Sequence, residues 1–131
     1  MSHTLEVRPD ESLIIVTYQG QVDAREMAET QRAMMQAGQQ LGSEHVFCVL
    51  DVRHSQVSFV DGVINIKEFM FKQRNVPALD NLQVSLIFVG MNSVVTNFTQ
   101  FLKMIPGNKY QVSTAQDMDE ALELVKRMGV N

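Results

Sequence analysis

Three short runs of apolar residues constrain most strongly what this chain can fold into. They cover residues 13–16, 46–50 and 86–89, and turn-forming or polar residues bound each of them. Unbroken apolar runs of this length are typical of strands that are buried on both faces. The chain must therefore cover both faces of a sheet, which predicts helices between the strands.

Helix signals stand between these runs. Asp23 lies three residues before Glu26, and this spacing allows each side chain to satisfy a free backbone N–H at a helix start. Gly42 is a plausible end for this first helix. Asp61 predicts the start of a second helix, which should end before Pro77.

Two more helices follow in the second half of the chain. Ser93 is the predicted cap of a helix with apolar residues at helical spacing over residues 94–105, and Thr96, Asn97, Thr99 and Gln100 form its other face. Asp117 with Glu120 repeats the acidic capping arrangement, and Gly129 ends the last helix.

The order of elements predicts the fold class. Leu5 and Val7 alternate with polar residues and predict a short edge strand that forms a hairpin with the strand over residues 13–18. A strand over residues 110–113 precedes the last helix. Strands and helices then alternate, which indicates an α/β fold with a mostly parallel or mixed central sheet of about five strands and about four covering helices. At 131 residues, the chain is predicted to form a single domain over residues 1–131.

The composition of the chain limits the classes of partner that it can bind. The chain has 11 basic and 15 acidic residues and a formal net charge of -4, so it lacks the cationic excess that binds a phosphate backbone. We therefore expect no nucleic acid partner. No apolar run approaches the roughly 20 residues of a membrane-spanning helix, and residues 1–10 lack a secretory signal pattern. We expect a cytoplasmic protein with no membrane span.

The motifs of several enzyme classes are missing from the sequence. No glycine cluster follows a strand, and no GxSxG motif occurs, so nothing predicts a nucleotide cofactor or a serine nucleophile. His45 and Cys48 are three apart on a predicted strand, so they should point to opposite faces and form no metal site. Cys48 is expected to be a buried thiol with a raised pKa. The prediction is a protein with no catalytic residues, no metal and no cofactor.

Asp51 and Asp61 bracket the polar loop predicted at residues 53–56. As two carboxylates they are the only pair that we nominate for acid–base chemistry. A structural interpretation is simpler, because Asp51 can pair with Arg53 and Asp61 can cap the second helix. His54 lies in the same loop, beyond the carboxyl end of a predicted strand, where ligands of open α/β sheets bind.

Two segments resemble the STAS domain family, and in particular its SpoIIAA-like, anti-sigma factor antagonist-like group. The sequence GQVD at residues 20–23 is similar to the motif that opens the first helix of that family. The sequence VLDVRHSQVSFVDG at residues 49–62 is similar to the family's strand, loop and second helix start. The element order and the sequence Asp-x-x-Glu-Ala at residues 117–121 also fit, so the resemblance covers nearly the whole chain.

The resemblance implies a regulatory role, with one departure. In anti-sigma factor antagonists, the serine after the second motif's aspartate accepts a phosphate from a partner kinase. Here Gly62 and Val63 follow Asp61, and neither can be phosphorylated. Ser55 and Ser58 are nearby hydroxyls, but their spacing does not indicate that they replace that serine.

We therefore expect a non-enzymatic, STAS-like regulatory domain that binds a partner protein. The candidate surface consists of Asp51, Arg53, His54, Ser58, Asp61, Gly62 and Val63. An alternative is a carrier of a small lipid-like or anionic molecule, with the helix over residues 94–105 as one wall of its pocket. A small enzyme that uses Asp51 and Asp61 is a further, weaker alternative. The edge strand and the low-charge helix each offer a surface for a homodimer.

Overall fold

Five strands form one sheet in the order β1-β2-β3-β4-β5, which is also their order along the chain. The computed structural model of the chain describes residues 3–57, 83–90, 93–104 and 111–129. β1 is antiparallel to β2, and the other neighbouring strands are parallel to one another. The strands are β1 (His3–Arg8), β2 (Leu13–Val22), β3 (His45–Val57), β4 (Gln83–Val89) and β5 (Gln111–Ala115). The predicted α/β fold with a mixed five-stranded sheet is confirmed.

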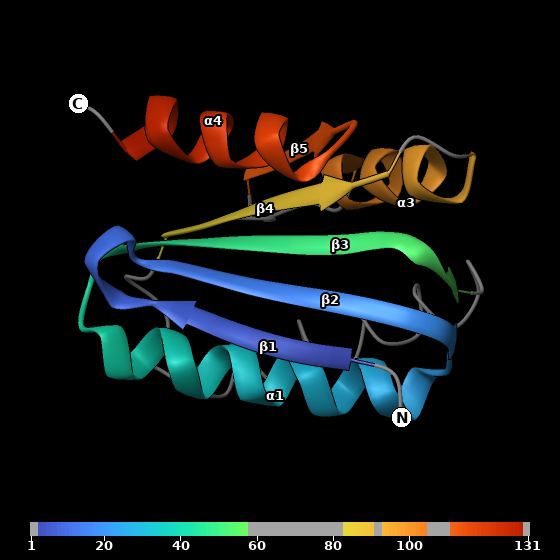
Figure 1. Cartoon of the computed structure of the whole chain (residues 1–131), viewed down its shortest axis with the longest axis horizontal. Helices are drawn as coiled ribbons and strands as arrows, with labels where there is room; N and C mark the ends of the chain where they lie inside the picture. Colours follow the sequence, from blue (N-terminus) through green and yellow to red (C-terminus); the bar gives the residue numbers. More distant parts are fainter. Residues whose placement is uncertain (1–2, 58–82, 91–92, 105–110, 130–131) are drawn as a thin grey trace.

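Helices lie on both faces of this sheet. In the described residues they are α1 (Ala24–Leu41), α3 (Ser93–Met104) and α4 (Met118–Gly129), with a 3-10 turn at Pro9–Glu11. The connections through α1 and α3 step across the sheet in the same direction, so right-handed crossovers place both helices on one face. Figure 1 shows α1 passing behind β1 and α4 in front of β5. The predicted second helix, from Asp61, lies outside the described residues.

The core is split into two layers by the alternation of side chains along the strands. On the α1 face, Ile14, Cys48 and neighbouring residues pack against Met27 of α1. On the opposite face, Leu13 and Ile15 of β2 and Phe47 and Val49 of β3 form a second cluster with Ala121 and Val125 of α4. The apolar runs are therefore buried from both sides, as their sequence predicts. None of the described helices is long and apolar enough to cross a membrane.

The predicted helix ends follow from local hydrogen bonds. The Asp23 carboxylate accepts the N–H of Glu26 (2.8 Å), and Gly42 ends α1 with a positive φ of 67°. Asp117 accepts the N–H of Glu120 in the same way (2.8 Å). The Glu120 carboxylate in turn accepts the N–H of Gln116 (3.3 Å), which completes a cap at the start of α4.

Three predictions on individual residues are corrected. β2 does not end with the predicted residues 13–18 but continues to Val22, and residues 53–56 belong to strand β3 instead of a loop. The two extensions satisfy each other's backbone groups, because residues 19–22 pair with residues 54–57. Thr99 of α3 is buried instead of solvated, and its hydroxyl donates to the carbonyl oxygen of Thr96 (2.9 Å). That hydrogen bond satisfies the hydroxyl without water.

Candidate functional site

A two-stranded extension projects beyond the carboxyl end of the sheet. β3 pairs with β4 as far as Asp51, opposite Val89, whereas its pairing with β2 continues to Val57. We call residues 19–22 of β2 and 54–57 of β3 the β2–β3 ribbon. Figure 1 shows the ends of β2 and β3 reaching past the end of β4. The carboxyl ends of parallel strands are where α/β proteins bind their ligands and partners.

A β-bulge lies at the base of the β2–β3 ribbon. Thr17 pairs with Asp51 and Gln19 pairs with His54, so one intervening residue of β2 lies opposite two intervening residues of β3. One extra residue in a strand bends it and redirects the side chains that follow. The bulge therefore separates the buried part of β3 from the exposed part that carries Arg53 and His54.

Asp51 is a buried carboxylate that Arg53 holds from two directions. The Asp51 side chain is only 5% exposed, and that of Arg53 is 34% exposed. The guanidinium donates from Nε to Oδ1 (3.0 Å) and from Nη2 to Oδ2 (2.9 Å) of Asp51. The backbone N–H of Arg53 also donates to Oδ1 (3.1 Å), which forms an Asx-type turn at the bulge. The predicted pairing of Asp51 with Arg53 is confirmed.

Electrostatics keep this carboxylate ionised. Burial alone would raise the pKa of Asp51, but the side-chain and backbone hydrogen bonds of Arg53 and the charges of Arg53 and His54 outweigh it. The net effect is a pKa below the ordinary aspartate value. An acid–base role for Asp51 would require a carboxyl group that gains and loses a proton near neutral pH, and this environment opposes that.

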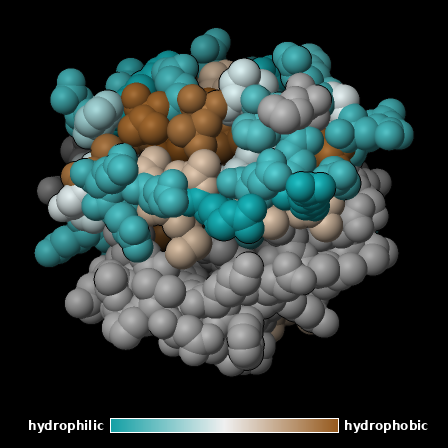
Figure 2. Space-filling view, turned by 90° about the horizontal axis from the view of Figure 1, so that it is seen from below, coloured by the Kyte–Doolittle hydropathy of each residue, from teal (hydrophilic) through white to brown (hydrophobic). Residues whose placement is uncertain are grey.

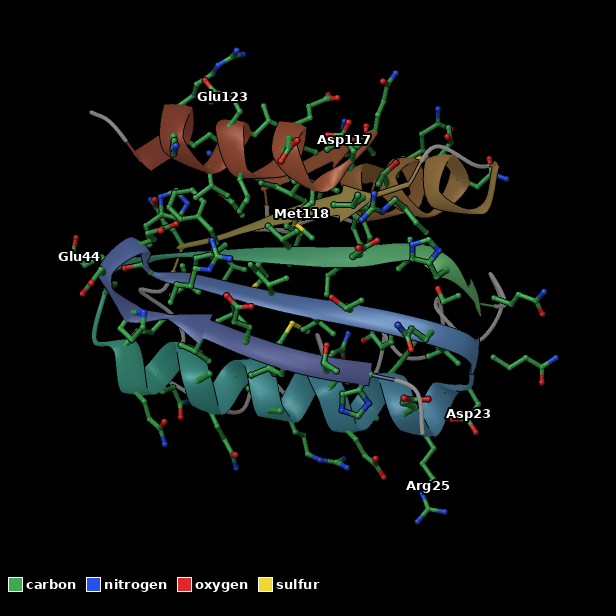
Figure 3. The ribbon with its side chains drawn as sticks, in the orientation of Figure 1. Asp23, Arg25, Glu44, Asp117, Met118 and Glu123 are labelled. Carbon is green, nitrogen blue, oxygen red and sulfur yellow. The ribbon has the colours of Figure 1, made fainter. Side chains whose placement is uncertain are left out.

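The start of α4 lies next to this ion pair. Gly90, at the end of β4, leaves space for Arg53: a Cβ at Gly90 would lie 3.7 Å from Arg53 Cγ. The N–H of Gly90 donates to the carbonyl oxygen of Ala115 (2.9 Å), which ties the ends of β4 and β5 together. In Figure 3, Met118 projects from α4 toward the sheet, whereas Asp117 sits at the helix start. The hydrogen bond to Asp51 is the main factor that raises the pKa of Arg53, and the charges of Asp51 and Asp117 add to it. Both acidic residues therefore favour the positive charge of Arg53.

The β2–β3 ribbon exposes mostly uncharged polar side chains. His54 and Gln56 are exposed on β3, and Gln19 and Gln21 are exposed on β2. Gln19 pairs with His54, and Gln21 pairs with Gln56. His54 therefore lies on a strand and not in the predicted loop. Arg53 and His54 are brought together, whereas Ser58, Asp61, Gly62 and Val63 lie outside the described residues.

Sequence reasoning missed three residues of this surface, Gln56 on β3 and, on the neighbouring strand, Gln19 and Gln21. Gln19 and Gln21 belong to the segment around residues 20–23, and His54 and Gln56 belong to the segment over residues 49–62. These are the two segments that carry the resemblance to the SpoIIAA-like group. The sequence signal was the resemblance of both segments to one family. It would have identified this surface only if the two segments had been expected to pair on neighbouring strands, as they do.

The other reactive side chains are buried or hydrogen-bonded within the fold. Cys48 is buried on the α1 face, and burial raises the pKa of its thiol to about 12. His45 lies toward the other face of β3, as predicted, because its ring stacks on Phe47. His45 Nε2 and Ser85 Oγ are 2.7 Å apart, and Ser85 Oγ donates to Gln111 (3.2 Å), so this serine is an internal link between β3, β4 and β5. Among the described residues, no group of three potential metal ligands occurs.

Comparison with known proteins supports the fold. No protein-family model matches the chain, and no curated protein matches it. One solved structure that it resembles is that of an uncharacterized protein of the DUF3478 family with a SpoIIAA-like fold, from Shewanella loihica PV-4. The two share 11% sequence identity with a TM-score of 0.62, over 95% of this chain and 92% of the other. The chain therefore has a SpoIIAA-like fold.

Proposed function

We propose that this chain is a non-enzymatic, STAS-like regulatory domain that binds a partner protein through the β2–β3 ribbon. The observation that carries the proposal is the in-register pairing of residues 19–22 with residues 54–57 beyond the end of β4. This pairing presents His54, Gln56, Gln19 and Gln21 on one projecting surface. Binding residues are often carried on such projections by a rigid scaffold.

The Asp51–Arg53 pair supports the proposed binding role, because it holds the base of the β2–β3 ribbon in place. Its hydrogen bonds fix the strand at the bulge, immediately before the exposed residues. A surface held in one conformation loses less conformational entropy when a partner binds. The candidate residues Ser58, Asp61, Gly62 and Val63 follow β3 directly in the chain, and we propose that they extend the same surface.

Two features favour binding over catalysis. The Cys48 thiol is buried and poorly ionised, so it lacks the thiolate that a nucleophile requires. The Asp51 carboxylate is bound to Arg53 and keeps a low pKa. The thiol and the carboxylate are therefore both held inside the fold in a form that is poorly suited to catalysis.

Site-specific photocrosslinking tests the surface. A photoreactive amino acid replaces Gln21 or Gln56 on the ribbon, or Glu29 on α1 as a control, and the chain is crosslinked in an extract of its own host. We expect one protein to crosslink from both ribbon positions and not from Glu29. Equal yields from the ribbon and from α1, or no protein shared by the two ribbon positions, would contradict the proposal.

Substitutions then test the same surface with the crosslinked protein in purified form. His54→Ala and Gln21→Arg should weaken its binding, measured by titration calorimetry, by about tenfold or more if these positions lie at the centre of the contact. Arg25→Ala is the matched control, because Arg25 projects away from the sheet below α1 (Figure 3) and is 88% exposed. Thermal unfolding of each variant shows whether the fold is retained.

A further inference from the structure

The β1 edge of the sheet is partly apolar. In the described part of the chain, β1 has β2 as its only neighbouring strand. Val7 is 37% exposed, and with Met104 it is one of two large apolar side chains exposed among the described residues. Leu5 lies on the same face as Val7, and Leu5 together with Met34 and Leu41 of α1 is partly buried against the same core cluster. Figure 2, which views the molecule from below, shows apolar atoms side by side and bordered by hydrophilic ones.

The charges on this edge are self-complementary. Glu6 and Arg8 flank Val7 and point to the face opposite α1, and Arg8 Nε donates to Glu6 Oε2 (2.5 Å). Two antiparallel copies of β1 related by a two-fold axis at Val7 would place Glu6 of each copy opposite Arg8 of the other. Each charge would then have an opposite charge both beside it and across from it, which favours the pairing. Val7 would face Val7 of the second copy on the apolar side.

Other antiparallel registers lack this match. An axis at Glu6 would place the two Glu6 carboxylates directly opposite each other, which is destabilising. An axis at Leu5 would place Glu6 opposite Thr4 and leave the charge pair unused. The 3-10 turn at Pro9 ends the strand, so the axis cannot lie much beyond Val7. Symmetry and charge therefore select one register.

We propose that a second copy of this chain docks on the β1 edge, antiparallel and with the two-fold axis at Val7. Such a dimer is isologous, and residues 6–8 of each copy pair with residues 8–6 of the other. The apolar patch of Leu5, Val7 and α1 adds buried surface beside the strands. The β2–β3 ribbon lies at the opposite end of β2 from residues 13 and 14, which pair with Arg8 and Val7, so the dimer and the proposed partner surface are separate.

Charge exchange is the sharpest test of this register. Sedimentation of the full chain over a range of concentrations should show a monomer–dimer equilibrium. Glu6→Arg and Arg8→Glu should each weaken self-association by about tenfold or more, since each places like charges opposite one another. The double variant E6R/R8E should restore the dimer, because the exchange keeps the charges complementary.

A mixture of the two single variants provides a second test of the register. A 1:1 mixture of Glu6→Arg and Arg8→Glu chains should form the heterodimer, which native mass spectrometry distinguishes from either homodimer. Circular dichroism checks that these variants fold. A chain that is monomeric at every concentration, or a dimer that E6R and R8E leave unchanged, would overturn the proposal. Failure of rescue in both the double variant and the mixture would also overturn it.

Disulfide trapping tests the axis directly. Residues opposite each other in an antiparallel pair have Cα atoms about 4.5–5.5 Å apart, which suits a disulfide. Val7→Cys should therefore crosslink two copies under mild oxidation, and Thr4→Cys on the same strand should not. The native Cys48 is buried and should not compete. Equal crosslinking from positions 4 and 7 would contradict the proposed register.

Discussion

The carboxylate of Asp51 is bound by the guanidinium and the backbone N–H of Arg53, two residues further along the same strand. This contact joins the buried part of β3 to its exposed end. It satisfies a carboxylate that is almost completely removed from water, so the charge depends on the arginine. The consequences for stability and for pH dependence can each be measured.

Removal of Arg53 should destabilise the fold. Arg53→Ala leaves the buried Asp51 carboxylate without its charged donor, and we expect a loss of about 1–3 kcal/mol in the free energy of unfolding. Urea denaturation measures this loss. Asp51→Asn combined with Arg53→Ala should cost less than the sum of the two single changes, because the two residues interact directly. Additive costs would show that the contact contributes nothing to stability.

The Asp51–Arg53 pair should also make the stability of the fold depend on pH. The folded state lowers the pKa of Asp51 below its ordinary value of about 3.9, so its contribution is complete above that value. The contribution is lost as the pH falls through the lower folded pKa. The stability difference between the wild type and Asp51→Asn should therefore be constant from about pH 7 to 5 and shrink below about pH 4. A difference that grows on acidification would have the wrong sign for this interpretation.

Local signals in the sequence predicted most of the fold. Apolar runs identified the buried parts of β2, β3 and β4, and Asp23 and Asp117 identified the starts of α1 and α4. Each of these features depends on residues a few positions apart, so it can be recognised from a single sequence. The Asp51–Arg53 pair was predictable for the same reason, since its partners are two residues apart.

The β2–β3 ribbon could not be predicted in this way. Residues 53–56 are all polar, and all but the partly buried Ser55 are exposed, so they lack the apolar alternation that reveals a strand with one buried face. They form a strand because residues 19–22, more than thirty positions earlier, provide their backbone partners. Gln19 and Gln21 carry no charge and match no reactive motif, so only the paired strands show that they share a surface with His54.

Cys48 should resist alkylation in the folded protein. Its thiol has a pKa of about 12, so at pH 8 it holds about a thousandfold less thiolate than an ordinary cysteine. Mass spectrometry after iodoacetamide treatment should show modification of Cys48 only when the protein unfolds. Gln40→Cys, at an exposed position of α1, provides a fast-reacting thiol in the same molecule. Comparable rates at positions 40 and 48 would contradict the burial of this thiol.

A second buried contact joins β2 to α1. The Thr30 hydroxyl donates to the backbone carbonyl of Met27 (2.9 Å), so it accepts the phenol hydrogen of Tyr18. Both side chains are almost completely buried. Burial is the main factor that raises the pKa of Tyr18, and the charge of Glu26 adds to it. The phenol is therefore neutral and depends on Thr30 as its acceptor.

Thr30→Val should leave this phenol without an acceptor at nearly constant side-chain volume. We expect it to cost about 1–3 kcal/mol, because a buried donor that loses its partner bears its full desolvation penalty. Combined with Tyr18→Phe, the same change should cost clearly less than the two single costs together, since the double variant leaves neither group unsatisfied. Denaturant unfolding of the four proteins yields this coupling energy. A coupling near zero would mean that the contact between β2 and α1 is held by apolar packing alone.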